Sequence, residues 1–240
     1  MSGTLYIVST PIGNLEDISF RAIRILKEAT LIAAEDTRRT QKLCTYYQIS
    51  TPLTSYHDFN KEEKSDILLH RLQAGGHIAL VCDAGTPLIS DPGYYLVNRA
   101  VEANVPLVPI PGPSSLLTAL CVSGLPTDRF IFEGFVPRKP GVRETFFEKL
   151  KNETGTIIVF ETQHRILKTL RAIQKTLGNR QIVLTRELTK INEEILRGKV
   201  EEICQRLENK SIKGEITLLI QGHPQRKNKQ ASFVDSLSIT

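Results

Sequence analysis

Short apolar runs that alternate with helical segments are the feature that most restricts the fold of this chain. Five runs in the first half are expected to be strands: Leu5–Ser9, Leu31–Glu35, Leu53–Tyr56, Ile78–Cys82 and Val105–Ile110. Helical periodicity lies between them, as in Phe20–Ala29 and in Glu62–Ala74, which ends at Gly75-Gly76. This alternation is typical of βα units that surround a mostly parallel sheet.

A proline-rich joint at residues 109–113 interrupts the pattern. Pro111 and Pro113 cannot continue a strand ladder, but Pro113 suits the first turn of a helix over Ser114–Val122. We therefore expect an N-terminal α/β domain at 1–113, a C-terminal α/β domain at 114–222 and a polar tail at 223–240. The second domain is expected to contain strands at Phe130–Phe135, Thr156–Phe160, Ile182–Glu187, Glu194–Arg197 and Ile216–Ile220, and helices at Arg143–Lys151, Arg165–Leu177 and Val200–Glu208.

Length and composition exclude several classes of protein. A chain of 240 residues can form two α/β domains, and it has no apolar run near the roughly 20 residues that a membrane span needs. The first strand begins almost at once, so no cleaved signal peptide is expected. The four cysteines are scattered without CxxC spacing, which argues against a metal site or a disulfide framework and favours the reducing cytoplasm.

The net charge of +5 is unevenly distributed. Residues 1–113 have 10 Lys and Arg against 12 Asp and Glu, whereas residues 114–222 have 18 against 13. A basic second domain is compatible with a nucleic-acid partner, because Lys and Arg neutralise phosphates. The alternative is a solvated basic surface without a partner.

Loops rich in Gly, Pro and small polar residues follow four of the expected strands. They are Ser9–Asn14, Asp36–Arg39, Asp83–Gly93 and the joint with Ser114-Ser115. Ligands of open α/β sheets bind beyond the carboxyl ends of the strands, although any one such loop can be an ordinary turn. None of the loops matches GxGxxG or a P-loop, so a nucleotide-like cofactor would have to bind by another route.

Two charged segments follow strands in the second half, at Glu161–Arg165 and Arg186–Lys190. His164 and Arg165 could hold phosphates at the start of a helix. The other reading of these segments is a solvated network of surface salt bridges.

Several motifs occur in a fixed order along the chain: Ser9–Leu15, Ala34–Arg38, Asp83–Gly93, Pro109–Ser114, Gly134–Pro137, Arg186–Lys190 and Lys213–Glu215. Together they resemble the tetrapyrrole methylase superfamily, and within it the bacterial enzymes that methylate a cytidine ribose 2′-OH in 16S rRNA. The resemblance covers about residues 4–222. It departs from the family at residues 161–165, where Glu-Thr-Gln-His-Arg replaces Glu-Ser-Pro-His-Arg, and at the end, where relatives continue into a short helical region.

The resemblance implies two α/β domains with parallel and mixed sheets, S-adenosylmethionine in the cleft between them, and a homodimer. It also implies 16S rRNA of the small ribosomal subunit as partner and substrate, with no metal and no membrane. The residues expected to contact the cofactor are Pro11, Asp83, Ala84, Gly85, Thr86, Ile89, Ser114, Ser115, Phe160, Glu161, Leu188, Gly214, Glu215, Ile216 and Thr217.

Methyl transfer to a ribose hydroxyl requires alignment of the reacting atoms and is helped by a base. The candidate bases are Asp36, Glu187 and His164. Positive side chains would position the phosphates that flank the target: Arg38, Arg165, Arg186 and Lys190. We expect Arg186, Glu187 and Lys190 to form the acceptor side of the cleft, and His164 and Arg165 to bind RNA.

Two alternatives to this function are open at the level of the sequence. One is a methyltransferase of the same fold that methylates a carbon of a tetrapyrrole. The other is a non-catalytic RNA-binding module for ribosome assembly that has kept the fold. The motifs Ser9–Leu15 and Arg186–Lys190, together with the basic second half, favour the RNA methyltransferase.

Overall fold

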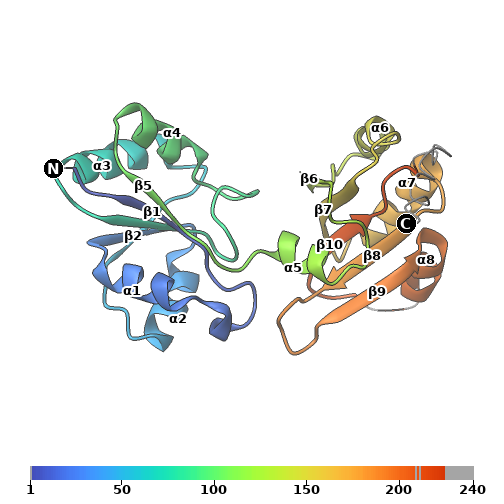
Figure 1. The fold of residues 1–240 in the computed structure, drawn as a ribbon, viewed down its shortest axis with the longest axis horizontal. Helices are drawn as coiled ribbons and strands as arrows, with labels where there is room; N and C mark the ends of the chain where they lie inside the picture. Colours follow the sequence, from blue (N-terminus) through green and yellow to red (C-terminus); the bar gives the residue numbers. More distant parts are fainter. Residues whose placement is uncertain (1, 209, 211, 225–240) are drawn as a thin grey trace, which may run out of the picture.

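The protein contains two five-stranded sheets (Figure 1). The structure, a computed structural model, describes residues 2–208, 210 and 212–224. The first sheet contains β1 (Leu5–Val8), β2 (Leu31–Ala34), β3 (Leu53–Ser55), β4 (Ile78–Val81) and β5 (Leu107–Ile110). Its strand order is β3-β2-β4-β1-β5, and every pairing is parallel. The prediction of a parallel α/β sheet in the first half is therefore confirmed.

Helices cover both faces of the first sheet. The 3-10 turn η1 (Leu15–Asp17) precedes α1 (Phe20–Glu28), which packs with α2 (Thr37–Tyr46) on one face, and α3 (Lys61–Gln73) packs with α4 (Tyr94–Glu102) on the other. Figure 1 shows these two layers below and above the sheet. Buried aliphatic side chains fill both interfaces, which is how a parallel sheet removes its two apolar faces from water.

Residues 36–39 were expected to be a loop, and the structure corrects this expectation. Asp36 is the N-cap residue of α2, because its carboxylate accepts a hydrogen bond from the Arg38 amide at 2.9 Å. Thr37, Arg38 and Arg39 therefore belong to the first turn of a helix. The polar segment directly after β2 is a helix start instead of an open loop.

The chain passes to the second sheet through β5 and α5 (Ser115–Cys121), which lies between the two halves in Figure 1. Ala119 and Leu120 of α5 pack with Ile158, Val183 and Leu219 on one face of the second sheet. The helix expected after Pro113 is present, and its apolar side covers the sheet face that points toward the first half.

The second sheet is mixed. It contains β6 (Phe130–Phe135), β7 (Thr156–Thr162), β8 (Gln181–Arg186), β9 (Glu194–Lys199) and β10 (Glu215–Ile220) in the order β6-β7-β10-β8-β9. Only the pairing of β6 with β7 is parallel. The helices α6 (Pro140–Lys149), α7 (Ile166–Leu177) and α8 (Val200–Glu208) cover the face opposite α5. The sequence predicts that α6 begins at Arg143. In the structure it begins earlier, at Pro140, which occupies the first turn.

The loop after β1 joins the two halves directly. Ile12 packs with Leu188 in the same apolar cluster as α5, and the Asn14 amide donates a hydrogen bond to Thr189 Oγ1 at 3.1 Å. Residues on the two sides of this contact are 175 positions apart in the sequence. The two sheets lie on either side of residue 113 in the sequence and touch through the loop after β1. The domain bounds at 1–113 and 114–222 stay a prediction, and most of the polar tail, residues 225–240, lies outside the described part of the chain.

Within the described ranges, no helix has both the length and the apolar character required to cross a membrane.

Candidate functional site

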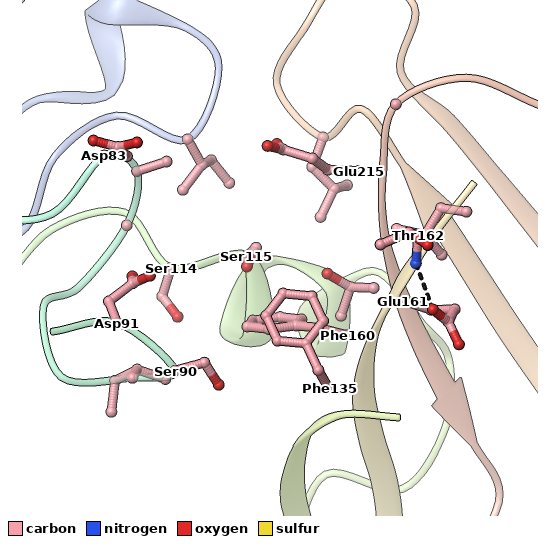
Figure 2. A pocket seen from close by; sticks show the side chains of 18 of the residues that line it. Asp83, Ser90, Asp91, Ser114, Ser115, Phe135, Phe160, Glu161, Thr162 and Glu215 are labelled. Atoms are coloured by element: carbon pink, nitrogen blue, oxygen red, sulfur yellow. Dashed lines mark hydrogen bonds between the residues drawn. The ribbon is translucent and has the colours of Figure 1, made fainter. Parts of the chain in front are cut away.

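A cavity of about 610 Å³ lies between the loops of the first sheet and the second sheet. This volume is within the range of sites that bind drug-sized ligands and cofactors. Figure 2 shows the first-sheet loops with Asp83, Ser90, Asp91 and Ser114 on one side, and Phe160 with Glu161 on the other. The carboxyl ends of parallel strands supply the first wall, as expected for an open α/β sheet.

The long loop after β4 forms a large part of the first wall. It is fixed to the loop after β1 by two backbone hydrogen bonds, from the Thr10 amide to the Gly85 carbonyl at 2.8 Å and in return at 3.0 Å. Leu88 and Ser90 have φ values of 75° and 65°, which are left-handed conformations that non-glycine residues seldom adopt. Such strain is common where a loop is shaped to hold a ligand.

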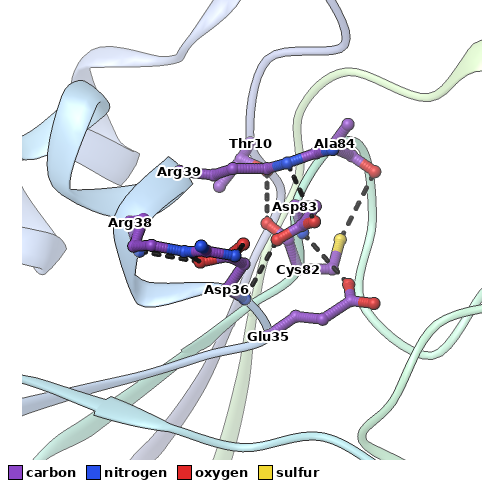
Figure 3. Close-up of polar contacts among 8 residues, drawn as sticks. All are labelled: Thr10, Glu35, Asp36, Arg38, Arg39, Cys82, Asp83 and Ala84. Carbon is purple, nitrogen blue, oxygen red and sulfur yellow. Dashed lines mark hydrogen bonds and ion pairs between the residues drawn. The ribbon is translucent and has the colours of Figure 1, made fainter.

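Three carboxylates in this wall, those of Glu35, Asp83 and Asp91, line the cavity together with Arg39. Crossed hydrogen bonds connect the ends of β2 and β4: the Asp83 amide donates to Glu35 Oε2 at 3.3 Å, and the Asp36 amide donates to Asp83 Oδ1 at 3.0 Å (Figure 3). Arg39 Nε lies 3.4 Å from Asp83 Oδ2. The first wall is therefore acidic, with one nearby guanidinium.

The surroundings of these carboxylates separate their pKa values. Burial raises the pKa of Glu35 and that of Asp91 above their ordinary values. In contrast, the hydrogen bond from the Arg38 side chain lowers the pKa of Asp36 to about 2. Glu35 and Asp36 are neighbours in the sequence, but they belong to different electrostatic environments.

Aromatic and backbone groups form the second wall. The Phe160 ring contacts the Phe135 ring at a centroid distance of 5.4 Å, and both side chains line the cavity. The first residues of β10 follow Gly214, whose amide donates to Gln163 Oε1 at 2.7 Å. Gln163 thus ties the turn after β7 to the beginning of β10.

A buried ion pair anchors the same turn. The Glu161 side chain has no exposed surface and accepts from Arg165 Nη2 at 2.5 Å, from Thr169 Oγ1 at 2.5 Å and from the Thr162 amide at 2.7 Å. The Arg165 side chain is 19% exposed. Arg165 is one of the side chains expected to bind RNA, but its guanidinium is engaged in the ion pair with Glu161.

The structure places all of the expected cofactor residues on the cavity wall except Pro11, whose neighbour Ile12 lies there instead. Of the residues expected to bind RNA or act in catalysis, His164 alone lines the cavity in the described part of the chain. Sequence reasoning missed Glu35, Arg39, Asp91, Phe135 and Gln163. A signal existed for two of them, because Glu35 ends a predicted strand and Asp91 lies in a loop already identified as ligand-binding.

The other expected catalytic residues do not line the cavity, and each of them is held in an ion pair. Arg38 is exposed and pairs with Asp36 at 2.8 Å, and Arg186 Nε lies 3.1 Å from Glu194 Oε2. Lys190 Nζ lies between Glu187 Oε1 at 2.9 Å and Glu215 Oε2 at 3.0 Å. A role for Arg186, Glu187 and Lys190 on the acceptor side stays a prediction. Their ion pairs fix the segment 186–190, against which the loop after β1 packs.

Metal-ion chemistry has no obvious ligand set in the residues that the structure describes. Within residues 2–208, 210 and 212–224, no three His, Cys, Asp or Glu side chains are grouped so that they could hold a metal ion.

Comparisons with known proteins agree with this architecture. Residues 4–204 match the family model of the tetrapyrrole (corrin/porphyrin) methylases. A ribosomal RNA small subunit methyltransferase I from Halalkalibacterium halodurans is 48% identical over 98% of this chain and 82% of its own length. One from Thermotoga maritima is 46% identical over 92% of this chain and 99% of its own length.

The fold is also found in a solved structure. The uroporphyrin-III C-methyltransferase of Thermus thermophilus, complexed with S-adenosylhomocysteine, superposes with a TM-score of 0.61 at 21% identity over 90% of this chain and 97% of its own. At that identity the likeness concerns the fold alone. The family model, the relatives and the two-sheet architecture together lead to one conclusion, namely that this chain belongs to the tetrapyrrole methylase family.

Proposed function

We propose that this chain transfers a methyl group from S-adenosylmethionine to the ribose 2′-OH of a cytidine in 16S rRNA of the small ribosomal subunit. The observation that carries the proposal is the cavity between the two sheets, which is lined by nearly all of the residues that the family resemblance assigns to the cofactor. Relatives that share nearly half of their residues with this chain over most of its length, and that are named for rRNA methylation, support the substrate.

The residues of the cavity fit the proposed cofactor. S-adenosylmethionine has an ammonium and a sulfonium group, and the carboxylates of Asp83 and Asp91 give the first wall a complementary charge. Phe135 and Phe160 offer an apolar surface for a heteroaromatic ring. The cofactor, when bound, supplies the electrophilic methyl group.

The chain itself contributes position and surroundings. Methyl transfer is an in-line displacement. Holding the acceptor oxygen in line with the methyl carbon and the sulfur can lower the activation barrier by up to about 7–11 kcal/mol in the best cases. The loop after β4 and the start of β10 both line the cavity, and hydrogen bonds from backbone amides hold both of them, to the Thr10 carbonyl and to Gln163 Oε1 respectively. A rigid cleft of this kind is suited to orienting two reactants.

Arg39 is the residue that we propose for binding the acceptor phosphate. Its side chain is 62% exposed and lies at the cavity, whereas Arg165 and Arg186 are mostly buried in ion pairs. Within the described part of the chain, the one ion pair of Arg39 is to Asp83 at 3.4 Å, which leaves the guanidinium able to contact a phosphate as well.

Arg39→Ala is expected to weaken binding of the enzyme to the RNA substrate and to reduce the slope of log affinity against log salt by about 1, because one phosphate contact is lost. Affinity for S-adenosylhomocysteine, measured by calorimetry, should not change. The matched control is Arg24→Ala on α1, an exposed arginine that pairs with Glu28. An equal loss of RNA affinity in both variants would contradict the specific role of Arg39.

The proposed function is tested by incubating the purified protein with labelled S-adenosylmethionine and small subunits that lack the modification, followed by nucleoside analysis of the 16S rRNA. Label in 2′-O-methylcytidine is the expected result. Transfer to a tetrapyrrole but not to RNA would favour the carbon-methylating alternative. Cofactor binding without transfer to either acceptor would instead favour an assembly role.

We also propose that the protein acts as a homodimer in the cytoplasm, where its ribosomal substrate is found. The dimer is supported by the family resemblance and by exposed apolar side chains at α5 and β6, namely Leu117, Val122 and Phe130. Sedimentation equilibrium of the purified protein is expected to give twice the mass of the chain. A mass of one chain at micromolar concentration would argue against the dimer.

A further inference from the structure

Three carboxylates, one thiol and two guanidinium groups lie close together after β2 and β4: Glu35, Asp36, Asp83, Cys82, Arg38 and Arg39. Their hydrogen bonds and ion pairs show which carboxylate is free to act as a base. A base for the acceptor hydroxyl must reach the cavity, and its carboxylate must not be neutralised by a cation. Asp36 fails both conditions, because it does not line the cavity and pairs with Arg38 at 2.8 Å. Asp83 lines the cavity, but it accepts a hydrogen bond from the Asp36 amide and lies 3.4 Å from Arg39 Nε.

Glu35 meets both conditions. Its half-buried side chain lines the cavity, and Oε2 accepts one long hydrogen bond, from the Asp83 amide at 3.3 Å. Among the residues that the structure describes, Glu35 makes no ion pair, and its Oε1 has no hydrogen-bond partner. Figure 3 shows this carboxylate next to the crossed hydrogen bonds and apart from the pair of Asp36 with Arg38.

We infer that Glu35 is the general base that accepts the proton of the acceptor hydroxyl in the proposed methyl transfer. The inference rests on the proposed function, and it assigns to Glu35 the role for which the sequence offered Asp36, Glu187 and His164. Two adjacent carboxylates at the end of one strand then have separate tasks. Asp36 starts α2, and Glu35 faces the reacting groups.

The charged surroundings of Glu35 are suited to this role. Asp83 and the thiol of Cys82 follow β4, Asp91 lies in the loop before α4, and Arg39 belongs to the first turn of α2. Burial is the main cause that raises the pKa of Glu35, and the charges of Asp91 and Asp83 act in the same direction, while Arg39 opposes them. A raised pKa makes the ionised carboxylate a stronger base near neutral pH.

The proposed step balances in atoms and charge. The proton of the 2′-OH passes to the Glu35 carboxylate while the hydroxyl oxygen forms a bond to the methyl carbon. The carbon–sulfur bond breaks, and its electron pair remains on sulfur. A carboxylate and a sulfonium become a carboxylic acid and a neutral thioether, and Glu35 then releases its proton to water.

Glu35→Gln tests the inference, because glutamine has nearly the same shape and keeps an oxygen that can accept from the Asp83 amide. Single-turnover methyl transfer to small-subunit RNA is expected to slow by about 10²–10⁴-fold. The wild-type rate should fall as the pH is lowered through the pKa of Glu35, and the variant should lack this limb of the profile. Calorimetry should give unchanged affinity for S-adenosylhomocysteine.

A second readout does not depend on activity. Carboxyl carbon resonances of ¹³C-labelled protein can be titrated by NMR, and the resonance that disappears in Glu35→Gln reports Glu35. Its pKa is expected to lie above the ordinary value for glutamate. A pKa at or below the ordinary value would overturn the inference.

Two further variants separate the possible outcomes. Asp91→Asn changes the other buried carboxylate of the cavity and should keep the acidic limb, while Glu28→Gln changes an exposed glutamate of α1 and should keep the full rate. Loss of the limb in Asp91→Asn but not in Glu35→Gln would overturn the inference, as would loss of S-adenosylhomocysteine binding in Glu35→Gln. If the wild-type protein binds S-adenosylhomocysteine but methylates no RNA, the proposed function itself fails.

Discussion

Glu161→Leu is expected to lower the free energy of unfolding of the protein by about 3–5 kcal/mol, because it breaks a buried ion pair by removing one partner. Glu161 has no exposed side-chain surface and accepts hydrogen bonds from Arg165 and Thr169, both at 2.5 Å. Without the carboxylate, the Arg165 guanidinium stays mostly buried without a counter-charge. Urea unfolding followed by circular dichroism measures the loss.

The double variant Glu161→Leu/Arg165→Leu is the control for this mechanism. Replacing both members of a buried ion pair with apolar residues is often nearly neutral, so the double variant should be more stable than the single one. The exposed pair of Arg171 with Glu208 supplies a second control, since Glu208→Gln should cost less than about 1 kcal/mol. A double variant less stable than Glu161→Leu would show that the buried charge on Arg165 is not the cause.

The same ion pair explains why the turn after β7 can serve as a cavity wall. Thr162, Gln163 and His164 line the cavity, and the bond from Arg165 back to Glu161 closes the turn around them. The family resemblance assigned Glu161 to the cofactor. Its contacts give it in addition a structural task, so Glu161→Leu should weaken S-adenosylhomocysteine binding as well as stability.

Most strands could be predicted from the sequence because strand formation here follows local apolar runs. Each expected strand of the first half overlaps an observed one, from β1 at Leu5–Val8 to β5 at Leu107–Ile110. The helix α2 was missed because Thr37–Tyr46 is largely polar and begins in what looked like a turn. The helix α4 was not predicted either, and it starts directly after Gly93, at the end of a glycine-rich loop.

The candidate site was predictable where it depends on loops and not where it depends on strand order. The loop Asp83–Gly93 could be identified from composition alone. The acidic cluster could not, because Glu35 and Asp83 are brought together only by the pairing of β2 with β4, which are not consecutive strands. The pairing of β8 with β10 likewise brings Glu215 to Lys190, a contact that no spacing in the sequence indicates.

Gly214→Ala is expected to weaken S-adenosylhomocysteine binding by about tenfold or more and to lower the free energy of unfolding by about 2–4 kcal/mol. Gly214 has a φ of +99°, and an added Cβ would lie 2.4 Å from Cγ and Oε1 of Glu187. Glu187 cannot easily move aside, since Oε1 accepts from Lys190 at 2.9 Å and from the Glu215 amide at 3.0 Å. The start of β10, which lines the cavity, must shift instead.

Gly141→Ala is the matched control for this clash. Gly141 lies in the first turn of α6, and an added Cβ would meet nothing within 4 Å, so alanine should be neutral or stabilise the helix by about 0.5–1 kcal/mol. Calorimetry with S-adenosylhomocysteine and urea unfolding should therefore separate the two variants clearly. If Gly214→Ala bound the ligand as tightly as Gly141→Ala, the start of β10 could move without disturbing the site, and its assignment as a fixed wall of the cofactor cleft would be wrong.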